Sequence, residues 1–274
     1  MKNLSILFFI FIAGILFSFN CMAEGNSDDQ TLNNQDDNAI IGEWLRMTYN
    51  GPVRINLKPD GVVEYDFGNN KKIDVTSTYQ LKQDTIIFMD KEGDTCPEKG
   101  IYKIDVNKYY LAFDLIDDNC GGRIKKVSAF WVKPDHKKSL NELNSRISNT
   151  NSSEARLNRA RMYMAMNQPK KAKPDFDYYI NHEEANARVY VNRASTCFPD
   201  DMKGVVDDCN TAINIDPKNK NAYFLKGLAL YDMGEKEKAC ENFKKAVETG
   251  FSILKVAERA RCAEYWDEEF LNEE

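Results

Sequence analysis

The sequence is poor in the residues that catalysis and metal binding most often use. Its 274 residues include two histidines, His136 and His182, and no two cysteines are separated by only two residues. No histidine lies close to a cysteine in the sequence, so the spacing argues against a zinc site. A glycine-rich phosphate-binding loop is missing, and no Ser-His-Asp or Cys-His set has positional support. We therefore expect no enzymatic activity, no cofactor and no bound metal.

Concentrated positive charge is absent as well. Lys and Arg number 37 against 43 Asp and Glu, which gives a net charge of −6. The densest basic run, Lys170, Lys171 and Lys173, is not interleaved with aromatic residues. We therefore expect no nucleic-acid partner. Adjacent acids such as Asp117-Asp118 and Asp207-Asp208 are interpreted as solubilising surface charges.

Long apolar runs are absent except near the N-terminus. Lys2 precedes an apolar run at residues 4–19, so residues 1–23 are predicted to be an export signal. The run is short for a membrane span. Cleavage after Ala23 would release a chain that starts at Glu24. Alternatively, Cys21 resembles the acylated cysteine of bacterial lipoproteins and would attach the chain to a membrane. Both alternatives stay open, and both place the folded part in the periplasm or cell envelope.

The segment after the predicted signal has no basic residue. Residues 24–40 carry five carboxylates and much Asn, Gln and Ser. Such a composition cannot bury enough apolar surface to fold. We predict a disordered acidic tether.

From residue 41 to residue 134 the apolar pattern has a period of two, which is typical of strands. Eight short segments rich in β-branched and aromatic residues are separated by turn sequences: 43–49, 53–58, 62–67, 71–79, 85–90, 100–106, 109–116 and 123–132. A meander of eight antiparallel strands loses its exposed edges by closing. We expect an up-and-down barrel, with an open sandwich as the alternative. Residues 135–150 are predicted to be a polar linker, with a possible helix at 139–147.

Several motifs in this segment resemble those of the lipocalin-like family of small exported barrels. They are Gly42-Glu43-Trp44, Lys58-Pro59-Asp60-Gly61 and the cysteine-flanked stretches 96–102 and 118–123. The resemblance implies a lipocalin-like β-barrel over residues 41–134. It also implies that Trp44 of the first strand closes one end of the barrel and that Arg123 of the last strand stacks on it. That pair would be structural.

After residue 150 the apolar pattern becomes helical. In residues 220–250 two amphipathic segments are separated by Gly234, with small residues at Gly227 and Ala239 and the bulky Phe243 between them. This pattern resembles the tetratricopeptide repeat, a helical hairpin of about 34 residues. Ala160 and Ala194 occupy the position of Gly227 in two earlier copies. We predict three repeats in residues 151–250 and a capping helix in residues 251–274.

Six cysteines follow residue 23, and they fall into three local pairs. Cys96 and Cys120 lie symmetrically about Lys108 in a predicted hairpin. Cys197 and Cys209 lie on the two helices of the second repeat, and Cys240 and Cys262 lie on adjacent helices. In an exported chain these pairs are predicted disulfides, although six cysteines allow about fifteen pairings before geometry is considered.

The tetratricopeptide resemblance implies that the first helix of each repeat lines a concave groove. It assigns partner contacts to Asn158, Arg161, Met164, Arg188, Asn192, Phe224, Lys226 and Tyr231. This mixture of amide, cationic and aromatic groups suits an extended peptide or protein segment. Leu157, Val191 and Leu228 lie beside this set, and core packing between repeats is an equal alternative for them.

Two functions from different classes are consistent with these features. The first is a non-enzymatic exported adaptor that holds a protein or peptide partner through the repeat groove. The second is a carrier whose barrel holds a small apolar ligand while the repeats dock it to a receptor. Eight strands of about six residues enclose an interior that side chains nearly fill. We therefore prefer the adaptor.

Overall fold

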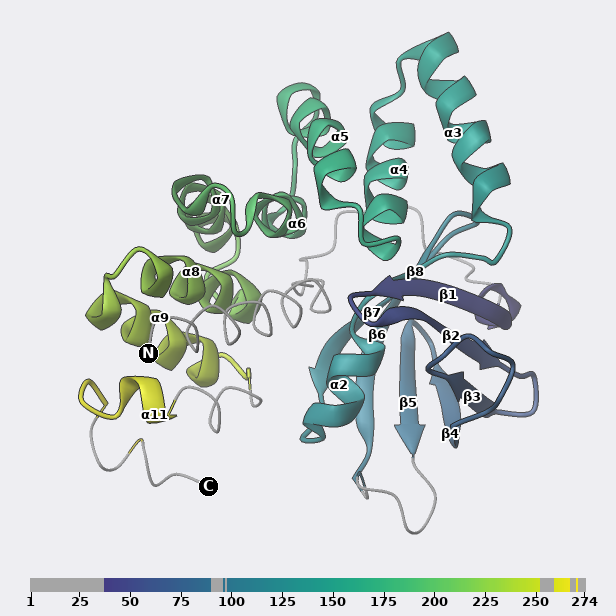
Figure 1. The fold of residues 1–274 in the computed structure, drawn as a ribbon, viewed down its shortest axis with the longest axis horizontal. Helices are drawn as coiled ribbons and strands as arrows, with labels where there is room; N and C mark the ends of the chain where they lie inside the picture. The colour runs from purple at the N-terminus through teal and green to yellow at the C-terminus, as the bar shows by residue number, and fades with distance from the viewer. Residues whose placement is uncertain (1–36, 90–95, 97, 252–258, 267–269, 271–274) are drawn as a thin grey trace. The chain divides into compact units, whose positions relative to one another are not determined.

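The computed structural model describes residues 37–89, 96, 98–251, 259–266 and 270 (Figure 1). The predicted export signal, Cys21 and residues 24–36 of the predicted tether lie outside the described residues. Contacts divide the chain into two units, and among the described residues the first ends at Glu183 and the second begins at Glu184. The first unit holds a sheet and the first helical hairpin. The second holds the later hairpins.

The sheet is an antiparallel meander that nearly closes into a barrel. Its strands follow one another in chain order: β1 (Gly42–Thr48), β2 (Gly51–Leu57), β3 (Val62–Asp66), β4 (Val75–Lys82), β5 (Thr85–Met89), β6 (Gly100–Val106), β7 (Leu111–Asp117) and β8 (Phe130–Trp131). Leu45 of β1 and Val132 exchange two backbone hydrogen bonds of 2.7 and 2.8 Å, which join the first strand to the last. The predicted eight-stranded barrel is therefore confirmed.

Large side chains fill the barrel interior. Alternate residues point inward because successive side chains on a strand face opposite sides. Trp44, Phe88, Tyr102, Phe113 and Trp131 are all 0% exposed. The Phe88 ring lies 5.7 Å from the Tyr102 ring and 5.6 Å from the Phe113 ring, both edge to face. Aromatic packing of this kind stabilises the barrel and occupies its interior.

The predicted last strand, residues 123–132, is wrong. Gly121–Val127 form a short helix, α2, and the strand that follows is only Phe130–Trp131. Arg123 therefore lies on α2, where its guanidinium binds both carboxylate oxygens of Asp118 at 2.7 and 2.8 Å. The cation that the structure places over Trp44 is Lys133, whose Nζ lies 3.8 Å from the ring centroid.

The end of the predicted tether is ordered. Asp37–Ile40 form a 3-10 helix, η1, and Ile40 is 2% exposed. The Trp44 Nε1–H donates to the Ile40 carbonyl oxygen at 2.7 Å. Burial of one apolar side chain and this hydrogen bond hold the segment against β1.

Helices form the rest of both units. The first unit contains α3 (His136–Thr150), α4 (Ser153–Ala165) and α5 (Pro169–His182), so the predicted linker is largely helical. The second contains α6 (Ala187–Cys197), α7 (Met202–Ile215), α8 (Lys220–Asp232), α9 (Lys236–Glu248) and α11 (Arg259–Cys262). Helices α4 and α5, α6 and α7, and α8 and α9 pack as successive hairpins. No helix in the described ranges is long and apolar enough to cross a bilayer.

Close packing and a repeated ion pair hold the hairpins together. A Cβ added at Gly227 would lie 2.6 Å from the Phe243 ring, so α8 and α9 approach closely only because residue 227 is glycine. In the first hairpin, Arg159 of α4 binds Asp175 of α5 with two bonds of 2.7 Å. Arg193 Nε binds Asp208 in the same way at 2.9 Å in the second hairpin. Asp208, interpreted from the sequence as a surface charge, is therefore a buried anchor, 5% exposed.

Two of the predicted disulfides are present. Cys96 is bonded to Cys120 in the first unit, and Cys240 of α9 is bonded to Cys262 of α11 in the second. The third prediction is wrong, because Cys197 and Cys209 are buried and no disulfide joins them in the described structure. Cys197 is the last residue of α6 and Cys209 lies within α7.

Candidate functional site

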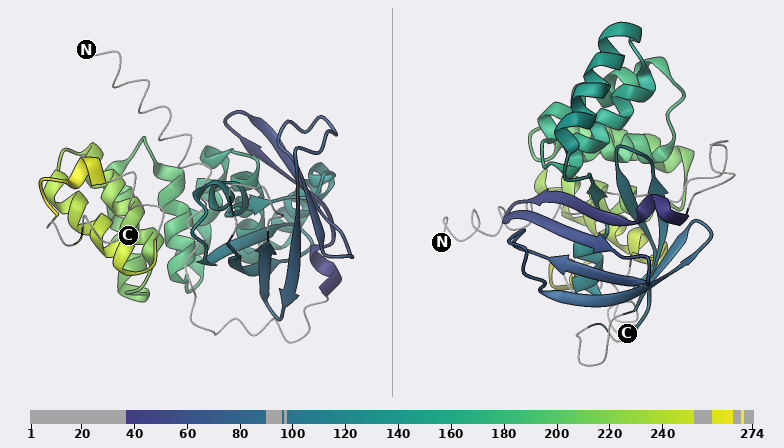
Figure 2. Two further views of the ribbon diagram at one scale, coloured as in Figure 1. Left: turned by 90° about the horizontal axis from the view of Figure 1, so that it is seen from below. Right: turned by 90° about the vertical axis from the view of Figure 1, so that its right-hand side faces the viewer.

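The first repeat helix docks on the barrel of its own unit. Helix α4 packs against β8 and β1 (Figures 1 and 2). The turn between β6 and β7, residues 107–110, contacts α4 on the face that carries Asn158 and Arg161. Asn107 Nδ2 donates to Asn158 Oδ1 at 3.0 Å. Arg161 Nη1 donates to the Tyr110 hydroxyl and lies 3.9 Å from Asp105 Oδ2.

The same turn is held from its other side by α3. The Tyr109 hydroxyl donates to Glu142 Oε1 at 2.8 Å and accepts from Arg146 Nη1 at 3.2 Å. Lys108 also binds Glu142, and this hydrogen bond lowers the pKa of the Glu142 carboxyl below its usual value. The turn therefore lies between two helices and is bonded to both.

The shape of the turn is set within the barrel. Asn107 Oδ1 accepts hydrogen bonds from the backbone N–H groups of Tyr109 and Tyr110 at 2.8 and 3.2 Å. The Tyr110 hydroxyl donates to Asp105 Oδ1 at 2.9 Å, and its ring meets the Phe130 ring edge to face at 5.7 Å. Because these bonds are local, the turn presents its side chains to α4 in a fixed conformation.

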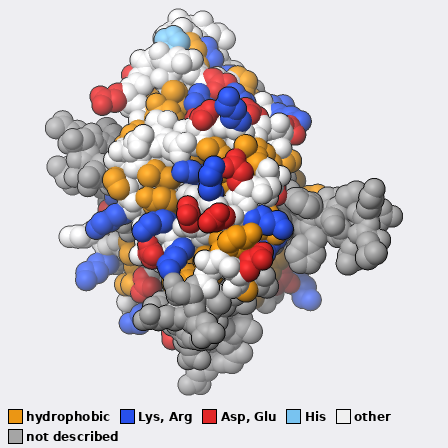
Figure 3. Space-filling model, turned by 90° about the vertical axis from the view of Figure 1, so that its left-hand side faces the viewer, with side chains coloured by type: hydrophobic (Ala, Val, Ile, Leu, Met, Phe, Trp, Pro, Cys, Tyr) orange, Lys and Arg blue, Asp and Glu red, His pale blue; other side chains and the backbone are white. Residues whose placement is uncertain are grey.

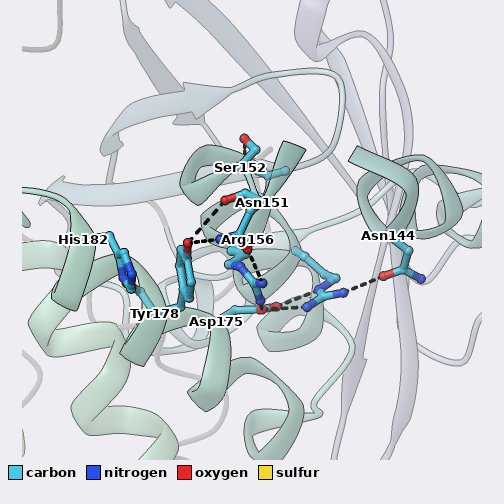
Figure 4. A network of polar contacts seen from close by, with 9 residues as sticks. Asn144, Asn151, Ser152, Arg156, Asp175, Tyr178 and His182 are labelled. Atoms are coloured by element: carbon cyan, nitrogen blue, oxygen red, sulfur yellow. Dashed lines mark hydrogen bonds and ion pairs between the residues drawn. The ribbon is translucent and has the colours of Figure 1, made fainter. Parts of the chain in front are cut away.

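A polar network joins α3, α4 and α5 on the side of the hairpin shown in Figure 4. Arg156 Nη2 donates to Asn151 Oδ1 at 2.9 Å, and its guanidinium lies 4.1 Å from the Tyr178 ring centroid. The Tyr178 ring stacks on His182 at 3.9 Å. Arg159 extends the network, because its Nη1 donates to Asn144 of α3 at 2.7 Å. These contacts fix the angle between the three helices.

The equivalent position in the second repeat has no such partner. Asn192 of α6 corresponds to Asn158 of α4, and it is 0% exposed. Neither its Oδ1 nor its Nδ2 makes a hydrogen bond among the described residues. A buried amide without hydrogen bonds is uncommon and costs about 1–3 kcal/mol. This amide is the most unusual group on the α6 face.

Residues 221–249 match the family model of the tetratricopeptide repeat. The chain contains a tetratricopeptide repeat. The matched repeat is the hairpin of α8 and α9, and the fold of the chain is a nearly closed antiparallel barrel followed by tetratricopeptide-like helices. A search of curated proteins finds no match to the chain.

Parts of the chain also resemble solved structures. MamA is 20% identical with a TM-score of 0.42, covering 49% of this chain and 91% of its own. YrrB, described as having an unusual peptide-binding site, is 14% identical with a TM-score of 0.43, covering 50% and 72%. The first tetratricopeptide domain of Spaghetti (RPAP3), bound to the HSP90 peptide SRMEEVD, is 17% identical with a TM-score of 0.39, covering 42% and 94%. Because all three TM-scores are below 0.5, these similarities support no conclusion about function.

The structure places the residues that the sequence assigned to partner binding in different surroundings. Asn158 and Arg161 contact the barrel turn, and Met164 is 6% exposed in the same helix. Phe224 of α8 stacks on Phe251 at 4.7 Å and is 8% exposed. Tyr231 lies 5.2 Å beneath the Arg261 guanidinium. Arg188 and Lys226 are half-buried, whereas Leu157, Val191 and Leu228 are buried.

Sequence reasoning missed the residues of the barrel turn that meet α3 and α4. Asn107 and Lys108 were read only as turn formers, and no local pattern distinguishes them from the other turns. Lys108 binds Glu142 of α3 and Asn107 binds Asn158 of α4, which lie 34 and 51 residues later in the chain. The described residues contain no cluster of three or more His, Cys, Asp or Glu able to hold a metal ion. On the face shown in Figure 3, basic and acidic side chains are interspersed with apolar ones.

Proposed function

We propose that this chain is a non-enzymatic adaptor, exported to the cell envelope, that binds an extended protein or peptide segment along the first helices of its repeats. One observation carries the proposal. In the first repeat, Asn158 and Arg161 already bind a turn of polypeptide through an amide and a hydroxyl. Because residues 107–110 occupy that face, we assign partner binding to α6 and α8 of the second unit.

The accessible side chains of this face suit a peptide with acidic residues. Lys226 of α8 is half-exposed and favours an acidic side chain in the partner. Asn192 is 0% exposed, so its amide does not reach a partner bound on this surface.

The disulfides support export. Cys96–Cys120 and Cys240–Cys262 would persist in an oxidising compartment and be reduced in the cytosol. Attachment through an acylated Cys21 belongs to the same proposal. Labelling with a lipid analogue tests it, because Cys21→Ser should abolish the label and cleavage before Glu24 should prevent it.

Site-specific photo-cross-linking tests the binding face. A photoreactive residue replaces Lys226 on α8 or, as the control, Glu241 on the exposed side of α9. We expect the Lys226 position to capture a discrete protein and the Glu241 position not to. Equal capture at both positions contradicts the proposal.

The barrel interior does not favour the carrier. Its centre holds Trp44, Phe88 and Phe113, each 0% exposed. A native apolar ligand extracted in stoichiometric amount from the purified full chain would reverse this preference.

A further inference from the structure

The exposed large hydrophobic side chains of the first unit lie at one end of the barrel. In a meander, every second turn lies at the same end of the barrel. The 107–110 turn, which contacts α3 and α4, lies at one of the two ends. The opposite end, called the loop end, consists of residues 47–50, the β3–β4 loop 67–74 and residues 116–127. The large hydrophobics that are exposed among the described residues of this unit are Met47, Tyr49, Ile73 and Ile116, at 38%, 70%, 44% and 40%. All four belong to the loop end.

The segments of the loop end are in contact with one another. Arg54 Nη2 of β2 donates to Asn69 Oδ1 of the β3–β4 loop at 2.6 Å. Lys126 Nζ of α2 lies 4.2 Å from the ring centroid of Phe67. Arg46 Nη2 of β1 donates to the Lys125 carbonyl oxygen at 3.0 Å, so α2 also meets the first strand. The apolar residues are therefore carried by one continuous surface.

The β3–β4 loop has a fixed shape. The Asp66 carboxylate accepts hydrogen bonds from the backbone N–H groups of Gly68, Asn70 and Lys71 at 3.2, 3.1 and 2.8 Å. The Phe67 N–H donates to Asp74 Oδ2 at 2.8 Å, which closes the loop. Ile73 is therefore exposed on a preformed loop, and binding through it requires little loss of conformational entropy.

Four exposed lysines belong to the segments of the loop end. Lys71, Lys72, Lys125 and Lys126 are all exposed at this end. Asp66 is buried and faces the backbone of its own loop. Among the described residues of this end, the exposed acids are Asp74, whose carboxylate binds Phe67, and Asp117 and Glu98 on the β6–β7 side. Exposed lysines therefore outnumber exposed acids among the described residues of this end.

We propose that the loop end binds the surface of a bilayer that contains anionic phospholipid. Tyr49, Met47 and Ile73 enter the boundary between headgroups and acyl chains, and the lysines bind the phosphates. Tyr and Lys suit this boundary because each joins an apolar body to a polar tip. Tyr49 and Ile73 lie in separate turns and Met47 lies near the end of β1, an arrangement that suits a flat, fluid surface better than a peptide. Anionic headgroups complement the lysines.

Tryptophan quenching by brominated phospholipids tests the contact directly. The native tryptophans Trp44, Trp131 and Trp266 are 0%, 0% and 7% exposed, so acyl-chain bromine should not reach them. In the full chain, Tyr49→Trp adds one exposed tryptophan. We expect its emission to shift to the blue and to be quenched on vesicles with brominated phosphatidylglycerol. Phosphatidylcholine vesicles should leave it unchanged.

Charge variants and matched controls complete the test. Lys71→Gln with Lys72→Gln should weaken the phosphatidylglycerol-dependent quenching by roughly tenfold or more in apparent affinity. Lys137→Gln with Lys138→Gln, an exposed adjacent pair on α3, should leave it unchanged. Tyr265→Trp, at a position 40% exposed in the second unit, should not be quenched. Equal melting temperatures confirm that the variants fold.

Two results would overturn the proposal. One is the absence of quenching at position 49 on phosphatidylglycerol vesicles, which would leave a protein as the occupant of this end. The other is an equal loss of affinity in the two lysine double variants. The apolar run at residues 4–19 is common to every variant, so it cannot produce a difference among them.

Discussion

Asn158 and Asn192 occupy the same position in successive repeats but have different surroundings. Asn158 accepts a hydrogen bond from Asn107, whereas the amide of Asn192 is buried without one among the described residues. The unpaired amide of Asn192 therefore lowers the stability of the second unit, whereas Asn158 helps to hold α4 on the barrel.

Asn192→Leu should raise stability. The substitution replaces an unsatisfied buried amide with an apolar side chain of similar size, so we expect a gain of about 1 kcal/mol in unfolding free energy. Denaturant unfolding measures the change. Asn158→Leu is the matched control and should lower stability, because it leaves Asn107 without its acceptor. A loss of stability in Asn192→Leu would contradict this account.

Asp118 and Arg123 form a buried ion pair, with side chains 0% and 3% exposed. The sequence had assigned Asp118 to the surface and Arg123 to Trp44. The Tyr102 hydroxyl also binds Asp118, and burial together with this carboxylate raises the pKa of Tyr102. The Arg123 guanidinium further donates to the Glu98 carbonyl oxygen at 2.7 Å, beside the Cys96–Cys120 disulfide.

Arg123→Met should destabilise the first unit by about 3–5 kcal/mol, because it leaves the Asp118 carboxylate buried without a counter-charge. Thermal unfolding measures the change. Lys245→Met breaks an exposed pair with Glu248 on α9 and should not change the melting temperature measurably. Similar effects of the two substitutions would show that the Asp118 site is not desolvated.

At the scale of elements, the β6–β7 turn determines how α4 meets the barrel. Arg161→Met and Tyr110→Phe each remove one partner of the same hydrogen bond, and each should cost about 1–3 kcal/mol. The double variant should cost less than the sum, because both changes delete one shared interaction. Denaturant unfolding of the four variants gives the coupling energy. Simple additivity would mean that the turn and the helix are not coupled through this contact.

The β3–β4 loop should lose its shape in acid. Burial raises the pKa of Asp66, but hydrogen bonds from Asn70, Lys71 and Gly68 outweigh it, and the pKa lies below its ordinary value. Stabilisation by a carboxyl with a lowered pKa is present above the unfolded pKa of about 3.9 and is lost as the pH falls through the folded value. The protection of residues 67–74 against hydrogen exchange, measured relative to the intrinsic exchange rate at each pH, should therefore fall below about pH 4. Asp66→Asn should exchange faster at neutral pH and show a weaker acid dependence. An unchanged acid dependence would assign the effect to another group.

At the scale of the whole molecule, contacts assign the first hairpin to the unit of the barrel. Helix α4 packs on β8 and β1, where Phe130 and Val132 are 0% and 1% exposed. Residues 37–183 should therefore melt cooperatively when expressed alone. Residues 37–150 lack α4 and should melt at a lower temperature and bind the dye ANS through the uncovered strands. Equal melting temperatures for the two pieces would place the boundary between the two domains in residues 135–150, as the sequence predicted.

Much of the architecture could be predicted from local patterns. A period of two from residue 41 indicated the strands, and Gly227, Gly234 and Phe243 indicated a hairpin that matches the tetratricopeptide repeat. Residues 123–132 were misassigned because a pattern of alternating apolar residues does not show that Asp118 binds Arg123 and favours the α2 helix. Cysteine spacing also could not show where Cys209 lies along α7 relative to Cys197.

The sequence by itself determined the class of each segment, because hydrogen bonding within a strand or helix imposes a periodicity that appears in consecutive residues. It also indicated three plausible disulfides between neighbouring elements, of which two are present. Only the tertiary structure decided that Asn158 and Arg161 bind a barrel turn, that Asp118 and Asp208 are buried, and that exposed apolar side chains share one barrel end. These contacts join residues that are far apart in the sequence. The periodicity of a segment depends on its own consecutive residues, so it does not show which distant segment it will contact.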